Sequence, residues 1–436
     1  MTEMIKKYFG FDQTGATYKN EIIGGVTTFL TMAYIFIVNP LILQAAGMPL
    51  GPSMVATVLT AFFGTLIMGI YARRPFAIAP YMGENAFIAY TVVQVLGYSW
   101  QTALGAIFIG GVIFVIISLA GLRKWLASAI PDSLKIGFAV GIGLFLTFIG
   151  MNDAGIVVLG TAAAPVHVGD FTSGSVILGM ICFLLVAILL YYRVPAALMI
   201  GILIVSVLAM IFNITDVPDA IISTPPSLGP IFLQLDIAGA LTWGFLSVIL
   251  TIFIIDFVDT TGTLLGISLK ADLLDENGEL PEIEKPMLCD SLSTVVASLL
   301  GTSTPGVYLE SAAGIEAGAR TGFASVITAF LFLLTLFFAP LLTAVPPCAY
   351  GPALMIVGLL MLSPIRKLKF DDLSEIVPAF VVIVLMSFTY NLGIGLTGGL
   401  VTYPLMKVFA GKYREVRGGM WVLFALSALF YIFYPY

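Results

Sequence analysis

Residues 73–87, RRPFAIAPYMGENAF, and residues 301–314, GTSTPGVYLESAAG, interrupt two long apolar runs in the same manner. Each segment places proline and glycine, which break helices, directly before residues that can form one. Extended backbone at membrane depth is tolerated only where it is buried in protein or lines a cavity. Each segment therefore predicts a short strand followed by a half-helix, with the positive end of the half-helix towards the protein centre.

The two segments also match each other in detail. Pro80 is followed five residues later by the polar Asn85, and Pro305 is followed five residues later by the polar Glu310. Both pairs are 225 positions apart. A second set of matches, 215 positions apart, joins Pro131 and Gly143 to Pro346 and Gly358. Such a pattern predicts an internal repeat whose halves meet at a shared site.

The composition places the whole chain in a membrane. Of 436 residues, 59% are apolar or aromatic and only 10% are charged, against about a quarter in soluble domains. A soluble globular protein is excluded. The net charge of −6 is small and dispersed, which argues against a nucleic-acid surface. Residues 1–21 are polar, so the first apolar helix is expected to be the insertion signal rather than a cleaved leader.

Apolar runs predict seven spans in each half of the chain. With the N-terminus inside, every cluster of Lys and Arg falls on the cytoplasmic side, and the odd number of spans inverts the second half. The run 420–434 is short and is left open as a further crossing, a re-entrant piece or a surface helix. The predicted spans are 22–46, 53–71, 76–96, 102–122, 134–151, 175–192 and 195–212, then, after a polar loop 213–235, 241–269, 287–300, 308–319, 323–343, 349–362, 373–390 and 392–409.

Ionisable residues within spans are costly and are therefore functional candidates. Asp256 lies in the middle of LSVILTIFIIDFVDTTGTLLG, Asp259 follows three residues later on the same helix face, and Thr260 lies beside them at the four-residue spacing. Glu84 and Glu310 open the two half-helices, and Asn85 occupies the matching repeat position.

Structural explanations stay open for each of these residues. A buried acid or amide can hold two helices together by hydrogen bonds, and this applies to Asp256 and Asn85. Asp259 can cap a helix, Glu84 can cap the third span, and Glu310 can be a favourable charge at a helix start. Beyond these, Glu316 precedes Arg320 at the spacing of an ion pair.

Several classes of chemistry find no support in the sequence. It contains no phosphate-binding loop, no cluster of metal ligands and no nucleophile elbow, which argues against an ATP-driven pump, an enzyme or a cofactor. The single histidine, His167, lies in a polar loop and cannot serve a midplane site. A coupling proton would have to be carried by a buried carboxylate, because desolvation disfavours the charged form.

Four motifs closely resemble the AzgA-like purine permeases, a branch of the nucleobase-cation symporters in the nucleobase/ascorbate transporter group. They are TTFLTMAYIFIVNPLIL (27–43), YMGENAF (81–87), FIIDFVDTTGTLLG (253–266) and TPGVYLESAAGIEAGARTGF (304–323). The resemblance implies an all-α polytopic membrane protein built as a 7+7 inverted repeat, usually dimeric. It implies a core domain of residues 22–122 and 238–343, a gate domain of residues 131–213 and 346–410, and a C-terminal apolar segment, 411–436.

The same resemblance implies roles for individual residues. Asp256 and Glu310 correspond to acids that hydrogen-bond the nucleobase, and the third-span motif implies that Asn85 and Glu84 contribute to substrate binding. Thr260 stands where uracil-type relatives have a histidine. That departure puts a histidine relay in doubt, so Asp256, Asp259 and Glu310 are the expected carriers of the coupling proton.

The sequence thus predicts a proton-coupled importer of purine nucleobases (adenine, guanine or hypoxanthine) in the cytoplasmic membrane, working by alternating access; Na⁺ is not excluded as the coupling ion. One alternative is an anion carrier of the same fold, although anions would favour a basic site. Another is a channel or receptor. The preferred purine and the dimer contacts are not determined by the sequence.

Overall fold

The structure is a computed structural model that describes residues 2–121, 129–161, 163–242, 245–271, 273–276 and 280–433. The end of the predicted 102–122 span and small parts of the 238–343 and 411–436 ranges lie outside the described residues. The first half of the chain contains α1 Thr2–Phe9, α2 Phe11–Thr14, α3 Tyr18–Met32, α4 Ile35–Ala45, α5 Leu50–Ile67 with η1 Met68–Ala72, α6 Met82–Ala86 with η2 Phe87–Val95, α7 Trp100–Leu119, α9 Asp132–Asp153, α10 Gly174–Tyr191 and α11 Ala197–Ile211.

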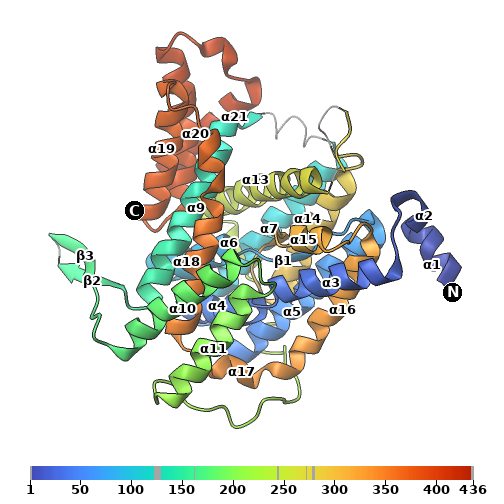
Figure 1. Ribbon diagram of the computed structural model, residues 1–436. Coiled ribbons are helices and arrows are strands. Elements are labelled where there is room, and N and C mark those ends of the chain that lie inside the picture. Colours follow the sequence, from blue (N-terminus) through green and yellow to red (C-terminus); the bar gives the residue numbers. More distant parts are fainter. Residues whose placement is uncertain are drawn as a thin grey trace.

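The second half of the chain runs from α12 to α21 (Figure 1). It contains α12 Ile237–Ala240, α13 Leu246–Lys270, α14 Glu284–Leu300, α15 Ser311–Glu316, α16 Gly322–Leu334 with η4 Thr335–Phe338, α17 Pro340–Thr343, α18 Pro347–Met361 with η5 Ser363–Lys367, α19 Leu373–Phe388, α20 Leu392–Phe409, η6 Tyr413–Glu415 and α21 Gly418–Phe433.

Within the described residues, eight helices are long and apolar enough to cross a membrane. The helices α11, α16 with η4, α19 and α21 are apolar but shorter. Helix α14, in the predicted ninth span, carries buried polar residues along its length, including Asp290, Ser293 and Thr294. It is therefore a polar helix packed inside the protein rather than an apolar span facing lipid.

The first predicted span differs from its sequence-based bounds. The helix begins earlier, at Tyr18, because the Thr17 side chain accepts the Asn20 N–H at 3.2 Å and caps it. It is then interrupted between Met32 and Ile35, so that α3 and α4 are separate helices. Tyr34, at this interruption, is 1% exposed and lies in a run, residues 32–40, that is buried throughout.

The two predicted strands are present and pair with each other. Strand β1 Ile78–Pro80 runs antiparallel to β4 Pro305–Val307, with Pro80 opposite Pro305. The matched prolines of the two halves are thus direct neighbours. The prediction of short strands followed by half-helices in an all-helical membrane fold is confirmed.

The contacts around the strands are reciprocal. The Tyr81 N–H donates to the Thr304 carbonyl at 2.9 Å, and the Tyr308 N–H donates to the Ala77 carbonyl at 3.0 Å. Each phenol also donates to the opposite segment, Tyr81 to the Val307 carbonyl and Tyr308 to the Pro80 carbonyl. The two rings stack with centroids 5.8 Å apart.

Glycine is required where these elements approach most closely. A Cβ at Gly306 would lie 1.9 Å from the Tyr81 ring, so a side chain there would displace the stacked tyrosine. A Cβ at Gly143 would lie 2.8 Å from the Gly358 carbonyl, and one at Gly358 would lie 2.3 Å from the Gly143 carbonyl. The repeat-matched glycines therefore form the contact between α9 and α18.

The helices pack in two groups. Helices α9, α10, α11, α18, α19 and α20 contact one another extensively, and helices α3, α4, α5, α7, α13, α14 and α16 form a second group. Figure 1 shows α13 (yellow) and α6 next to α9 (teal), where the two groups meet.

Two connections lie outside this helical body. The predicted polar loop around His167 contains a hairpin of β2 Val157–Thr161 and β3 Ala164–Val168, which extends from the end of α9 (Figure 1). His167 pairs with Val158 in this hairpin, and its side chain is exposed, with Nδ1 2.7 Å from the Val168 carbonyl oxygen. It is thus far from the buried centre, as expected.

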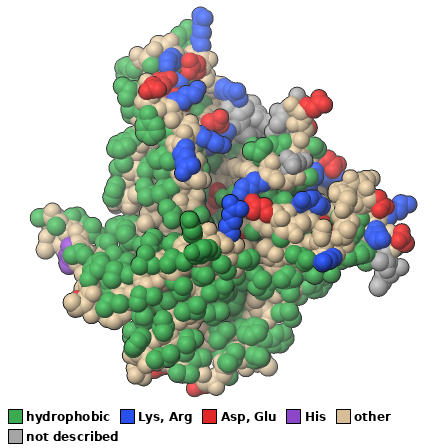
Figure 2. Space-filling view, in the orientation of Figure 1, with side chains coloured by type: hydrophobic (Ala, Val, Ile, Leu, Met, Phe, Trp, Pro, Cys, Tyr) green, Lys and Arg blue, Asp and Glu red, His purple; other side chains and the backbone are tan. Residues whose placement is uncertain are grey.

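Charged and apolar side chains separate on the surface. Figure 2 shows a broad apolar belt below, with Lys, Arg, Asp and Glu gathered at the opposite end. By the positive-inside rule, that charged end is the cytoplasmic face.

Candidate functional site

Two buried carboxylates lie between α13 and α14, and each is held by a threonine of the other helix. The Thr294 hydroxyl of α14 donates to Asp256 Oδ2 at 3.2 Å. The Thr260 hydroxyl of α13 donates to Asp290 Oδ2 at 2.6 Å. On both helices the acid precedes the threonine by four residues, one helical turn. The result is a crossed pair, Asp256 with Thr294 and Asp290 with Thr260.

The crossed pair leaves one oxygen of each acid available. Asp256 is 1% exposed and Asp290 is fully buried, and among the described residues neither Oδ1 has a hydrogen-bond partner. Sequence analysis missed Asp290, because the run that contains it is short and rich in Ser and Thr. The signal that could have found it is the D-x-x-x-T spacing, which occurs at 256–260 and again at 290–294. Thr260, predicted to bind substrate, donates its hydroxyl to Asp290.

The third-span candidates lie at the start of α6. Glu84 is 1% exposed, and neither of its carboxylate oxygens has a partner among the described residues. The Asn85 amide nitrogen donates to the Asn39 side-chain oxygen, while its own oxygen has no partner among those residues. The break at 78–80 thus places both polar side chains inside the protein.

The tenth-span candidate, Glu310, occupies the position before α15. Its Oε1 accepts a hydrogen bond from the Tyr34 hydroxyl at 2.9 Å. Glu310 is only partly buried, whereas Tyr34 is almost fully enclosed. Strand β4 and the crossing with β1 therefore position Glu310 close to the protein centre, as predicted.

A cavity of about 890 Å³ lies between α13 and the helices α9, α18, α19 and α20. On α13 its wall includes Asp259, Gly262 and Gly266, and a Cβ at Gly262 would meet no neighbour within 4 Å. At its other end are the basic residues Lys135, Lys367, Lys369 and Arg417. The cavity thus reaches from Asp259 to the cytoplasmic face.

The two carboxylates of α13 are not equivalent, although the spacing suggested one common face. Asp256 packs against α14, while the partly exposed Asp259 lines the cavity. The physical reason is that three residues make less than one full turn of an α-helix, so the two side chains point in different directions around its axis. Asp256 therefore faces α14, whereas Asp259 faces the cavity.

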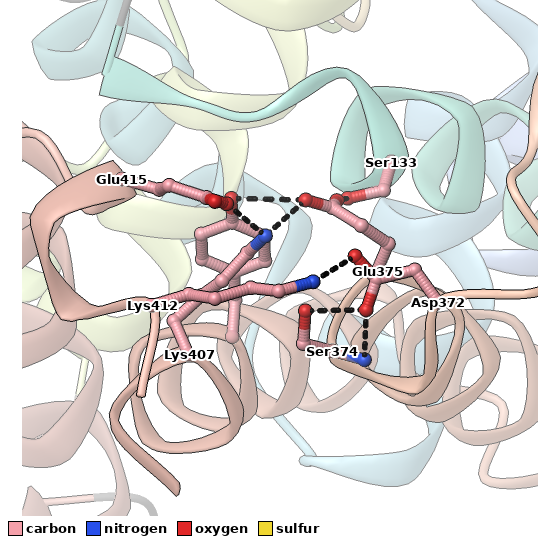
Figure 3. Close-up of polar contacts among 8 residues, drawn as sticks. Ser133, Asp372, Ser374, Glu375, Lys407, Lys412 and Glu415 are labelled. Carbon is pink, nitrogen blue, oxygen red and sulfur yellow. Dashed lines mark hydrogen bonds and ion pairs between the residues drawn. The ribbon is translucent and has the colours of Figure 1, made fainter. Parts of the chain in front are cut away.

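A charged network forms part of the cavity wall at the cytoplasmic end (Figure 3). Lys407 of α20 is 1% exposed, and its Nζ lies 2.5 Å from Glu375 and 2.6 Å from Glu415. The Ser133 hydroxyl of α9 donates to the other Glu375 oxygen at 2.5 Å. The network joins α9, α19, α20 and the segment that leads to α21.

Two further acids have structural partners. The carboxylate of Glu316 lies 3.8 Å from Lys270 Nζ, whereas Arg320 donates to the carbonyls of Ile315 and Ala319, so the expected Glu316–Arg320 pair is replaced by a contact with α13. Glu21, which the sequence analysis assigned to the polar N-terminal segment, is fully buried. It accepts the N–H groups of Arg320, Thr321 and Ala324 and thereby caps α16.

No cluster of three or more His, Cys, Asp or Glu with metal-binding geometry occurs among the described residues. Asp256, Asp290 and Glu310 each accept a hydrogen bond from one hydroxyl group, of Thr294, Thr260 and Tyr34 respectively.

Comparison with solved structures supports the same architecture. The fold is similar to the transmembrane domain of the cyanobacterial bicarbonate transporter BicA, with a TM-score of 0.63 and 14% identity over 87% of this chain and 97% of that chain. It is also similar to murine SLC26A9, with a TM-score of 0.64 and 11% identity over 90% of this chain and 69% of that one. At these identities the likeness concerns the fold alone. The fold and its membrane-length helices together define a multi-pass membrane protein.

The sequence places the chain more narrowly. A family model described as "Permease family" matches residues 19–397, and the chain belongs to this family. It is 46% identical to a putative permease of Methanocaldococcus jannaschii over 100% of this chain and 99% of the relative. It is 43% identical to the guanine/hypoxanthine permease PbuG of Bacillus subtilis, over 98% and 100%. The adenine permease AdeQ of Escherichia coli is 40% identical, over 98% and 95%. These relatives are named permeases, and the family is one of transport proteins rather than enzymes, in agreement with the sequence-based expectation. The chain is a multi-pass protein of the cell membrane.

Proposed function

We propose that this protein imports purine nucleobases across the cell membrane by proton symport. The observation that carries the proposal is the group of carboxylate and amide acceptors around the β1–β4 crossing, contributed by α6, α13, α14 and the start of α15. The names of the relatives, which are guanine/hypoxanthine and adenine permeases, indicate the same substrate class.

The chemistry of a purine suits this set of acceptors. A purine presents ring N–H donors and ring-nitrogen acceptors in one plane, and a carboxylate can accept such an N–H. Buried polar atoms without partners are costly, so a ligand that supplies donors to them gains affinity. Glu310 and Asn85 are the proposed acceptors, and Asp256 accepts an N–H when charged or donates to a ring nitrogen when protonated. Glu84 and Thr260 complete the proposed binding residues, with Thr260 also donating to Asp290.

The coupling proton is proposed to reside on the α13 acids. Asp256 is enclosed and carries the proton, because desolvation disfavours an isolated buried charge. Asp259 lines the cytoplasmic cavity and serves as the exit for that proton. Glu310, which accepts a hydrogen bond from the neutral Tyr34 hydroxyl, is the third carboxylate that we propose to take up and release a proton during transport.

Alternating access is proposed to move the two helix groups against each other. The core would comprise residues 22–122 and 238–343 and the gate residues 131–213 and 346–410, and the packing described above supports this division. Helix α21, which lies in the predicted C-terminal segment 411–436, contacts α20 and α13 and so touches both groups. Assembly as a homodimer is part of the proposal and rests on the family resemblance.

An anion carrier is the alternative suggested by the fold neighbours. An anion such as bicarbonate requires donors or positive charge, whereas the buried centre here offers carboxylate acceptors. The acceptor set therefore favours a neutral base with N–H donors.

Uptake of radiolabelled hypoxanthine in cells that lack their own purine carriers tests the proposal. We expect saturable uptake that collapses with an uncoupler and is inhibited by adenine, guanine or xanthine but not by uracil or bicarbonate. Non-saturable flux would indicate a channel, and inhibition by bicarbonate alone would indicate an anion carrier; either result would refute the proposal.

A further inference from the structure

Two polar residues of the first membrane helix contact predicted site residues from both half-helices. Tyr34 directly precedes α4, where the span is interrupted, and its hydroxyl donates to Glu310 Oε1 at 2.9 Å. Asn39 lies five residues further along α4 and accepts a hydrogen bond from the Asn85 amide. Helix α4 and the residue before it therefore contact both the tenth span, through Glu310, and the third span, through Asn85.

The Asn39 side chain has all its polar atoms engaged. Its Nδ2 donates to Thr57 Oγ1 at 2.6 Å and to Thr302 Oγ1 at 3.1 Å, while its oxygen accepts from Asn85. An amide with both donors and its acceptor in use is fixed in one orientation. In this orientation the Asn39 oxygen accepts a hydrogen bond from the Asn85 amide nitrogen. The Asn85 side-chain oxygen then has no partner among the described residues and can accept a hydrogen bond from a ligand.

Tyr34 has the corresponding effect on Glu310. A phenol that donates to one carboxylate oxygen fixes the rotation of the carboxylate plane and therefore the direction of the other oxygen. Tyr34 is 1% exposed and Asn39 is fully buried, so both act through the residues that they hold.

We propose that Tyr34 and Asn39 are positioning residues that orient Glu310 and Asn85 as two acceptors for the N–H groups of a nucleobase. The proposal rests on the proposed function and deepens it. The recognised ligand is a planar base that donates two N–H hydrogen bonds. Selectivity between N–H and N-methyl positions then depends on residues outside the binding surface.

The test is Tyr34→Phe, which removes only the hydroxyl. We expect the half-saturating hypoxanthine concentration to rise about tenfold, while the maximal rate at equal membrane level stays within about a factor of two. The parent should reject one or more of 1-, 7- and 9-methylhypoxanthine in competition assays. In the variant, the difference in affinity between hypoxanthine and the rejected methylhypoxanthine should shrink by a similar factor, because the misplaced Glu310 carboxylate no longer accepts a hydrogen bond from the N–H. A purely structural role would lower protein level or maximal rate without changing discrimination.

Two further variants complete the test. Tyr431→Phe, which removes a hydroxyl that donates to the Ile394 carbonyl on α20, is the matched control and should behave like the parent. Asn39→Ser removes the two amide donors and should also raise the half-saturating concentration and change methyl discrimination. If Tyr34→Phe fails to reach the membrane, the half-saturating concentration and the methylhypoxanthine competition of Asn39→Ser provide the test. Parental affinity and selectivity in the variants that do reach the membrane would overturn the inference. Absence of purine uptake by the parent would instead refute the proposed function.

Discussion

Each acid of the buried centre has its own neighbours, and these neighbours give it a distinct role. Asp256 and Asp290 are each held through Oδ2 by a threonine, with Oδ1 left without a partner among the described residues. Glu310 is held by a tyrosine. These neutral donors stabilise a carboxylate without neutralising it, so each acid can still exchange a proton or accept an N–H from a ligand.

At the residue scale we expect Glu310→Gln to reduce purine uptake at least tenfold at equal membrane level. The amide keeps the volume but loses the charge and one acceptor, and hydrogen bonds to charged groups contribute about 1.5–3 kcal/mol. Radiolabelled hypoxanthine uptake measures the effect, with fluorescence of a tagged protein as the control for expression. Uptake within about a factor of two of the parent would show that Glu310 is only a structural charge.

The sequence alone could identify Asp256, Glu310 and Asn85, because a charge or amide in an apolar run or at a repeated break is visible as a pattern. Asp290 was visible only through the D-x-x-x-T spacing that it shares with Asp256, and Tyr34 and Asn39 were not visible as a pattern at all. Their importance comes from contacts with residues tens to hundreds of positions away, such as the Tyr34–Glu310 bond, which no local pattern encodes. Asp259 was visible, but whether it faces α14 or the cavity depended on the packing of neighbouring helices.

At the scale of elements, the strand pair and its tyrosines tie the two half-helices together. Proline and glycine at the two breaks made the strands predictable, and the matched positions Pro80 and Pro305 anticipated their pairing. The interruption of the first span at Ala33 and Tyr34 carries no proline or glycine, and the hairpin around His167 lies in a short polar run; neither was predicted.

The cytoplasmic start of α19 gives a prediction about pH. Lys412 Nζ lies 2.6 Å from Asp372, and the Ser374 hydroxyl and N–H also donate to that carboxylate, which together hold the pKa of Asp372 well below its ordinary value of about 4. A lowered pKa in the folded state means that the charged form stabilises the fold. This stabilisation is fully present above the unfolded pKa and is lost as pH falls through the lower, folded pKa.

We therefore expect Asp372→Asn to lower the thermal unfolding midpoint of the purified protein by a constant amount between about pH 8 and pH 5. The difference from the parent should shrink only below about pH 4. Thermal unfolding in detergent across this range measures it, with Asp216→Asn in the 213–235 loop as the control. A difference that disappears by about pH 6 would contradict the assignment.

At the scale of the whole molecule, function depends on motion between the two helix groups. Thr251 of α13 and Gly393 of α20 approach each other across their boundary, since a Cβ at Gly393 would lie 2.6 Å from Thr251 Oγ1. Gly25 of α3 and Ile327 of α16 are also in close contact but lie within one group, with a Cβ at Gly25 lying 3.0 Å from Ile327 Cβ.

In a background without the native cysteines, a disulfide between positions 251 and 393 should stop transport until it is reduced. A disulfide between positions 25 and 327 should leave transport close to its reduced level. Hypoxanthine uptake with and without reductant is the measurement. Inhibition by the second crosslink but not by the first would overturn the proposed division into core and gate.

The most direct test of the account is accumulation of hypoxanthine in proteoliposomes under an imposed pH difference, acidic outside. The parent should concentrate hypoxanthine above the external level, whereas Asp256→Asn should retain exchange of internal for external base but not accumulate it, because the proton carrier is gone. Asp259→Asn should slow accumulation by removing the exit to the cavity. If both variants still concentrate hypoxanthine in response to the pH difference as the parent does, proton coupling through the α13 carboxylates is wrong.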